Sequence, residues 1–137
     1  MRGQISLEFL LLFLGMIIVI LIATVYPGIF GLKKTVEISS MSLAYAAVSK
    51  MKQNIELVAS GDVGTTRIVY IKCPPGTWSV NNNILYFNRS GDINYNITAN
   101  CGIHINLNGN TTIKNLEIIR ATIVKVSQNT VNVTIST

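Results

Sequence analysis

The stretch that decides the fold is residues 5–25, ISLEFLLLFLGMIIVILIATV, a run of 21 residues broken only by Ser6, Glu8, Gly15 and Thr24. As an α-helix this run would be about 31 Å long, which matches a hydrocarbon core of roughly 30 Å. Burying each large apolar side chain is worth about 1.5–3 kcal/mol, so exposing the whole run to water is strongly disfavoured. We therefore expect a helix that spans a membrane.

The flanks of this run differ from those of an ordinary secretory signal. Such a signal has a shorter apolar core, followed by a cleavage site of small residues. Here Ala23-Thr24-Val25 is a poor cleavage site, and the polar residues Gln4, Ser6 and Glu8 lie at the beginning of the run instead. We expect the apolar helix to be retained in the mature protein.

A second helical pattern follows a short interruption. Pro27, Gly28 and Gly31 are expected to weaken helical order, because proline removes a hydrogen-bond donor and glycine costs about 1 kcal/mol in a helix interior. The pattern Ser60-Gly61-Asp62 then predicts a helix end. Between them, apolar residues recur on one helical face, at Met41, Ala44, Val48, Met51, Ile55 and Val58.

Beyond Gly64 the apolar residues alternate with polar ones, which is typical of β-strands with one solvated face. We expect five or six short antiparallel strands, including a hairpin in which Trp78 and Val80 pair with residues 84–87 across an asparagine turn. The amphipathic helix is the natural partner for their buried face. The sequence therefore predicts an α+β fold, a long helix packed on a small antiparallel β-sheet head, with His104 on the polar side of a strand.

Composition excludes several classes of function. Of the 137 residues 49% are hydrophobic and 12% are charged, which argues against disorder. The net charge of +5 is scattered, without the basic stripe and interleaved aromatic residues of a nucleic-acid binder. One histidine and two cysteines cannot assemble a zinc set, and the sequence has neither a phosphate loop nor a nucleophile elbow. We expect no enzyme activity, no cofactor and no metal.

The two cysteines, Cys73 and Cys101, are expected to form a disulfide in an exported domain. The loop of about 28 residues between them would contribute roughly 3–4 kcal/mol in the chain-entropy model. The alternative is a pair of buried free thiols.

Four N-glycosylation sequons begin at Asn88, Asn96, Asn110 and Asn132, all within the expected head. Each is a candidate glycan site. The alternative is an exposed polar strand face in which these asparagines only bind water.

The N-terminal pattern resembles a known signal. Gln4, Ser6, Glu8 and Leu12 form Q-x-S-x-E-x-x-x-L at the start of the apolar helix, after a short leader that ends Arg2-Gly3. This pattern resembles the class III signal of archaeal type IV pilins. The resemblance implies that a prepilin peptidase cuts between Gly3 and Gln4 on the cytoplasmic side of the membrane, and that the apolar helix is kept.

The same resemblance implies the lollipop plan of a pilin, with a leader at 1–3, an apolar assembly and transmembrane helix at 4–31, an amphipathic helix at 32–61 and a β-rich head at 62–137. It also implies a structural subunit that is inserted in the membrane before assembly and then forms a homopolymer, an extracellular filament that could mediate adhesion. Its partners would be other pilin subunits, the peptidase and the pilus assembly machinery. The alternative is a single-pass, membrane-anchored cell-surface binding protein that does not polymerise.

Glu8 has two interpretations. It could be an interfacial carboxylate that interacts favourably with the helix dipole, by about 0.3–1 kcal/mol. It could instead be retained for assembly, where it would meet the amine that cleavage creates at Gln4 of a neighbouring subunit.

Overall fold

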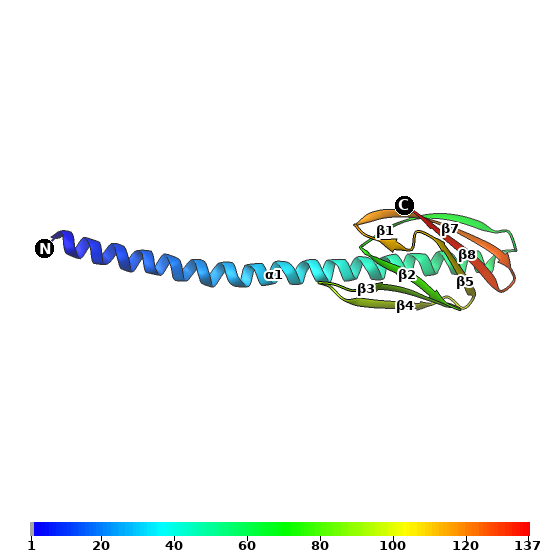
Figure 1. Ribbon diagram of the computed structural model, residues 1–137, viewed down its shortest axis with the longest axis horizontal. Helices are drawn as coiled ribbons and strands as arrows, with labels where there is room; N and C mark the ends of the chain where they lie inside the picture. Colours follow the sequence, from blue (N-terminus) through cyan, green and yellow to red (C-terminus); the bar gives the residue numbers. More distant parts are fainter. Residues whose placement is uncertain (1) are drawn as a thin grey trace. The chain divides into compact units, whose positions relative to one another are not determined.

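The computed structural model describes residues 2–137, so Met1, the first residue of the expected leader, lies outside the described part of the chain. Helix α1 and eight strands follow one another along the chain (Figure 1). The chain divides into two compact units, one that ends at Ile38 and one that comprises Ser39–Thr137, and α1 contributes residues to both. The elements are α1 (Arg2–Ser60), β1 (Thr66–Cys73), β2 (Gly76–Asn81), β3 (Ile84–Arg89), β4 (Tyr95–Asn100), β5 (His104–Gly109), β6 (Thr112–Ile113), β7 (Glu117–Ser127) and β8 (Thr130–Ser136).

The described part of the first unit is helical throughout, and α1 continues without a break through Pro27. The weakening predicted around residues 27–31 therefore does not interrupt the helix. The hydroxyl of Thr24 donates to the carbonyl of Ile20 at 2.9 Å, and that of Thr35 donates to Gly31 at 2.8 Å. Because these hydroxyls bond to the backbone of their own helix, the helix can carry them in an apolar environment.

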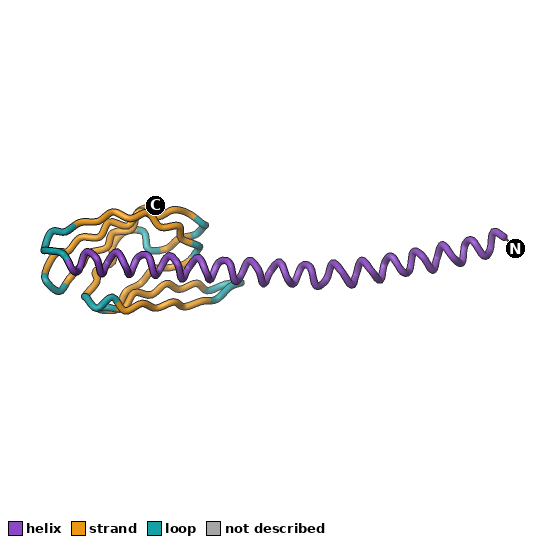
Figure 2. Tube along the Cα trace, turned by 180° about the vertical axis from the view of Figure 1, so that it is seen from behind, coloured by secondary structure: helices purple, strands orange, loops and turns teal. Residues whose placement is uncertain are grey.

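In the second unit, α1 packs its apolar face against the sheets, as the spacing of the sequence predicts (Figure 2). Met41 is partly buried against the same core. The other residues of the predicted face are buried in this core, which confirms the predicted amphipathic helix. The buried helical residues are Ala44, Ala47, Val48, Met51, Ile55 and Val58.

The described residues form eight strands, more than the five or six expected from the sequence, and these make two sheets instead of one. The sheets have four strands each, in the orders β1-β7-β8-β5 and β4-β3-β2-β6. The hairpin between β2 and β3 is confirmed, with Trp78 opposite Phe87 and Val80 opposite Leu85. Asn82 in its turn has a φ of 54°, a conformation that asparagine tolerates better than most residues. The α+β class predicted from the sequence is thus confirmed.

One strand pair differs from the antiparallel prediction, because β5 and β8 are parallel. The chain leaves β5, adds β6 to the other sheet, and returns through β7 before β8 pairs with β5. Gly109 at the end of β5 has a φ of 91°, and a Cβ there would collide with the carbonyl oxygen of Ile135. Local alternation predicts the strands themselves, but a crossover between sheets depends on contacts far apart in sequence.

Two lysines join α1 to the strands. The ammonium of Lys125 in β7 donates to the carbonyls of Ala59 at 2.7 Å and Gly61 at 2.8 Å. Lys50 on α1 donates to the carbonyl of Tyr70 in β1 at 2.7 Å. Because the last carbonyls of a helix lack intrahelical partners, the first of these contacts caps the C-terminus of α1 with a positive charge.

Candidate functional site

The four residues of the N-terminal motif lie on the first turns of α1, and all four are exposed. Helical spacing puts Gln4, Glu8 and Leu12 on one side of α1 and Ser6 on the opposite side. The motif therefore presents an amide and a carboxylate along one face of a helix whose other side chains are mostly apolar.

Glu8 is the single charged residue between Gly3 and Leu32. Among the side chains that the structure describes, the one ion pair is Lys52 with Glu56, at 3.6 Å. An acid costs about 2.5–3.5 kcal/mol at the centre of a membrane helix and less near its end. Glu8 thus carries a charge on an apolar surface without a counter-ion from the described part of its own chain.

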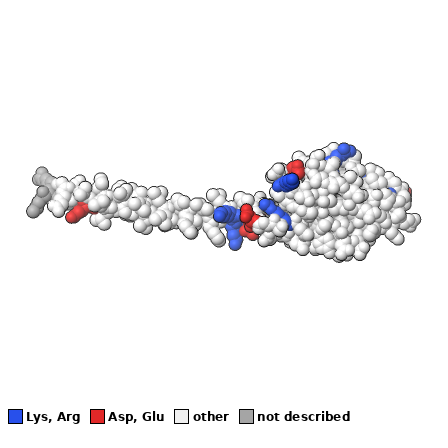
Figure 3. Space-filling view, viewed as in Figure 1, with Lys and Arg blue, Asp and Glu red and all other residues white. Residues whose placement is uncertain are grey.

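The apolar segment that follows runs from Phe9 to Leu32, 24 residues without a charged side chain. As a helix it is about 36 Å long, enough to cross a bilayer. Its most apolar 18-residue window has a mean hydropathy of 2.9 and no buried residue. Lys33 and Lys34 follow directly, and the ammonium of Lys34 lies 5.8 Å from the centre of the Phe30 ring. Figure 3 shows how few charged side chains lie along this segment.

The structure brings two of the four sequons together. Asn88 in β3 and Asn96 in β4 are cross-strand partners, and both are exposed. Asn110 is exposed between β5 and β6. Asn132 is half-buried in β8, where its carbonyl oxygen accepts a hydrogen bond from the Asn106 amide at 3.2 Å. Three of the four asparagines are therefore open to modification in the folded head, and Asn132 is the least accessible.

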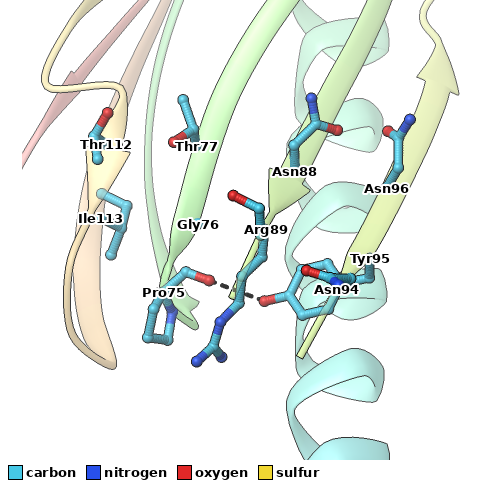
Figure 4. A pocket seen from close by; sticks show the side chains of 11 residues that line it. Pro75, Gly76, Thr77, Asn88, Arg89, Asn94, Tyr95, Asn96, Thr112 and Ile113 are labelled. Atoms are coloured by element: carbon cyan, nitrogen blue, oxygen red, sulfur yellow. Dashed lines mark hydrogen bonds between the residues drawn. The ribbon is translucent and has the colours of Figure 1, made fainter. Parts of the chain in front are cut away.

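Asn88 and Asn96 flank an open groove of about 810 Å³ on the second sheet (Figure 4). At one end the hydroxyl of Tyr95 donates to the carbonyl of Pro75 at 3.0 Å. One charged side chain, that of Arg89, lines the groove. With amides, hydroxyls and a single cation, the groove offers hydrogen bonds, but its lining has no nucleophile paired with a base.

The predicted disulfide is wrong in this structure, because Cys73 and Cys101 are both free and buried. Cys73 ends β1 two residues before Pro75, whose carbonyl accepts a hydrogen bond from the hydroxyl of Tyr95, at the start of β4. Cys101 lies six residues beyond Tyr95, just past the other end of β4, and that length of strand is about 20 Å. The two cysteines therefore lie near opposite ends of β4, farther apart than the roughly 7 Å between Cα atoms that a disulfide allows. The alternative of two buried free thiols holds.

Cys101 does lie beside other polar groups, since Glu56 and His104 line the same pocket of about 570 Å³. His104 is exposed on β5, as its place in the alternating run predicts. Burial, followed by the nearby Glu56 carboxylate, raises the pKa of the Cys101 thiol to about 11. The thiol is therefore protonated at neutral pH and is a poor nucleophile or metal ligand.

An exposed apolar helix of membrane length, joined to a folded β-rich unit, defines the class of this protein as one inserted in a membrane through a single helix. Similarity to known proteins identifies the family of this chain. A family model described as the class III signal peptide matches residues 2–26, which confirms the signal predicted from the sequence.

Two relatives match almost the whole chain. A probable pilin of Methanocaldococcus jannaschii is 66% identical over 134 residues, which cover 98% of this chain and 94% of the relative. The minor structural pilin EpdB of Methanococcus maripaludis is 38% identical over 135 residues, which cover 98% of this chain and 97% of that protein. No solved structure matches the chain. The chain therefore belongs to the archaeal pilins, whose subunits are inserted in the membrane as precursors and displayed at the cell surface in filaments.

Proposed function

We propose that this pilin is cut between Gly3 and Gln4 by a membrane prepilin peptidase and then polymerises through α1 into an extracellular filament. The observation that carries the proposal is the unburied apolar segment Phe9–Leu32, which begins directly after the signal motif. Its large side chains need an apolar environment at every stage. Lipid supplies it before assembly, and neighbouring helices supply it in the filament.

Glu8 would set the register of that packing. Cleavage before Gln4 creates an α-amine at the tip of the helix, and both groups become buried when helices bundle. Two opposite charges about 4 Å apart attract by on the order of 4 kcal/mol at an effective dielectric of 20. That attraction is large enough to offset the burial of the acid, so the favoured offset between helices is the one at which Glu8 meets the adjacent N-terminus. If Gln4 cyclises and loses its charge, the N–H groups of the first helical turn become the main partner.

The test is the substitution Glu8→Gln, which keeps the shape of the side chain and removes its charge. We expect the variant to insert in the membrane and to yield few sheared filaments. Because the peptidase could also read Glu8, the mass of the variant must be measured together with its filament yield. Glu37→Gln is the matched control, since it makes the same change further along α1, in a half-buried position beyond the apolar segment. Correctly cut Glu8→Gln protein in wild-type amounts of filament would show that Glu8 does not guide assembly.

The same preparation separates polymerisation from simple anchoring. A subunit of a filament leaves the membrane fraction when cells are sheared, whereas a single-pass surface-binding protein stays behind. Recovery of the mature chain in the membrane alone would therefore favour the anchored protein, with the groove beside Asn88 as its candidate binding surface.

The exposed sequons support a glycosylated, adhesive head, with glycans at Asn88, Asn96 or Asn110. Asn132 is expected to remain unmodified in the folded head, because it is half-buried in a strand that is paired on both sides. Mass spectrometry of sheared filaments measures the occupancy at each site. Peptides that carry no glycan at any of the four sites would leave the asparagines as a solvated polar surface.

A further inference from the structure

The outer face of the first sheet is divided into a polar and an apolar half. The side chains on β8 and β5 that face outward are polar: asparagine, threonine, serine and the single histidine, as at Asn106, Thr134 and His104. On β1 and β7 the outward side chains include Ile68, Tyr70 and Ile118, which are 46%, 61% and 64% exposed. We call these three residues the β1/β7 patch.

The register of the strands makes the β1/β7 patch continuous. Tyr70 lies opposite Arg120, and Lys72 lies opposite Ile118. The side chains of Tyr70 and Ile118 are therefore diagonal neighbours on one face of the sheet. Tyr70 and Ile68 are two residues apart on β1 and point to the same side. The exposed cations of Lys72 and Arg120 lie on the same face, between these apolar side chains.

The size of the patch indicates what covers it. Three such side chains present roughly 300 Å² of apolar surface, whereas a stable interface between independent proteins buries about 800 Å² on each partner. A partner free in solution would not be held by this contact alone. A copy already tethered through helix packing is present at a high effective concentration, and a small contact then suffices.

The charges indicate which surface of that copy fits. If the patch met itself across a two-fold axis, the cations of Lys72 and Arg120 from both copies would be brought together. The solvent face of α1 in the second unit is different, since Ser42, Tyr45 and Ser49 form an uncharged surface around a ring that is 58% exposed. This face points away from the sheets, because the opposite face of α1 is packed against them (Figure 2).

We infer that the β1/β7 patch of one copy packs against the Tyr45 face of α1 in the next copy. The two surfaces differ, so the contact is heterologous, and in a filament whose rotation between copies does not close a ring it generates an open-ended array. This inference rests on the proposed function, because the copies are held side by side only when they pack in a filament.

Cysteine crosslinking tests this contact in intact filaments. The double variant Tyr45→Cys/Tyr70→Cys introduces two exposed thiols. The native Cys73 and Cys101 are buried, with pKa values raised by burial to about 12 and about 11, and stay unreactive. After mild oxidation or treatment with a short bismaleimide, we expect most of the chain to move from the monomer band into a ladder of dimers, trimers and larger species.

The controls decide the outcome. Neither single variant should crosslink, and Tyr45→Cys/Thr134→Cys, which places its second thiol on the polar half of the same face, should remain monomeric. Monomers from intact double-variant filaments, or dimers from Tyr70→Cys alone, would overturn the inference and leave the proposed function in place. If the double variant fails to polymerise, Ser49→Cys/Ile68→Cys probes the same contact. A wild-type chain that is absent from sheared filaments would overturn the proposed function itself.

Discussion

The cap that Lys125 places on α1 can be tested by the substitution Lys125→Met, which keeps the length of the side chain and removes its ammonium. The variant loses two hydrogen bonds, to the carbonyls of Ala59 and Gly61. Hydrogen bonds from charged groups contribute about 1.5–3 kcal/mol, and a cation at a helix C-terminus adds about 0.3–1 kcal/mol. The backbone bonds of Lys125 with Gly64 and Thr65 are unaffected. We expect the free energy of unfolding to fall by about 2–3 kcal/mol.

The assay uses the full-length protein in detergent, with the fluorescence of Trp78 as the probe, because it is the one tryptophan and is 1% exposed. For a unit of about 100 residues the expected loss lowers the midpoint of thermal unfolding by about 10–20 °C. Lys114→Met is the matched control, since Lys114 is exposed and lies outside the strands. Lys125→Arg keeps the charge and should recover part of the loss. If Lys125→Met unfolds within about 0.5 kcal/mol of the Lys114→Met control, the cap does not stabilise the head.

Three further predictions concern the buried thiols and one glycine. When the protein is unfolded without reduction, Cys73 and Cys101 should each take up one alkyl group, whereas the native protein should take up none in the same time. If mass spectrometry finds fewer than two adducts on the unfolded protein, the two thiols are not both free. Since burial raises both thiol pKa values from 9.0, to about 12 and about 11, their contribution to stability is complete below pH 9 and is lost as the pH rises through 11 to 12. Denaturation between pH 9 and 11 should show a loss of up to about 1.4 kcal/mol per thiol per pH unit, and the Cys73→Ala/Cys101→Ala variant should lack this slope. Gly109→Ala should lower the free energy of unfolding by about 2 kcal/mol or more, because the backbone there is left-handed and the new Cβ collides with the Ile135 carbonyl. Gly91→Ala is the control, since Gly91 also has a positive φ but no atom lies near its Cβ position. The difference between the two variants measures the effect of the collision.

Much of the fold follows from local patterns in the sequence. The apolar run, the face from Met41 to Val58 and the hairpin at Trp78 each depend on residues close together in the chain, and the structure confirms all three. The exposed position of His104 follows from the same alternation. The signal motif is local as well, so nine residues are enough to predict the class III signal that the family model matches.

The features that the sequence did not predict depend on contacts between distant residues. Whether Cys73 and Cys101 meet depends on which ends of β1 and β4 lie together, and the number of residues between them carries no such information. The parallel pairing of β5 with β8 requires a crossover through the other sheet. Lys125 is one lysine in an alternating strand, and no local signal identifies the carbonyl of Ala59, 66 residues away, as its partner.

The two halves of α1 explain why we propose that a single carboxylate guides the assembly of this pilin. From Ala44 to Val58 the helix buries one face against the sheets, so the hydrophobic effect fixes that part during folding. The segment from Phe9 to Leu32 is apolar on all sides and has no such partner within residues 2–137. Moving it from lipid to a bundle of like helices exchanges one apolar environment for another, so the hydrophobic effect contributes little to assembly at that step. Packing and polar contacts must then decide whether and where the helices associate, and between Gly3 and Leu32 the one charged side chain is that of Glu8.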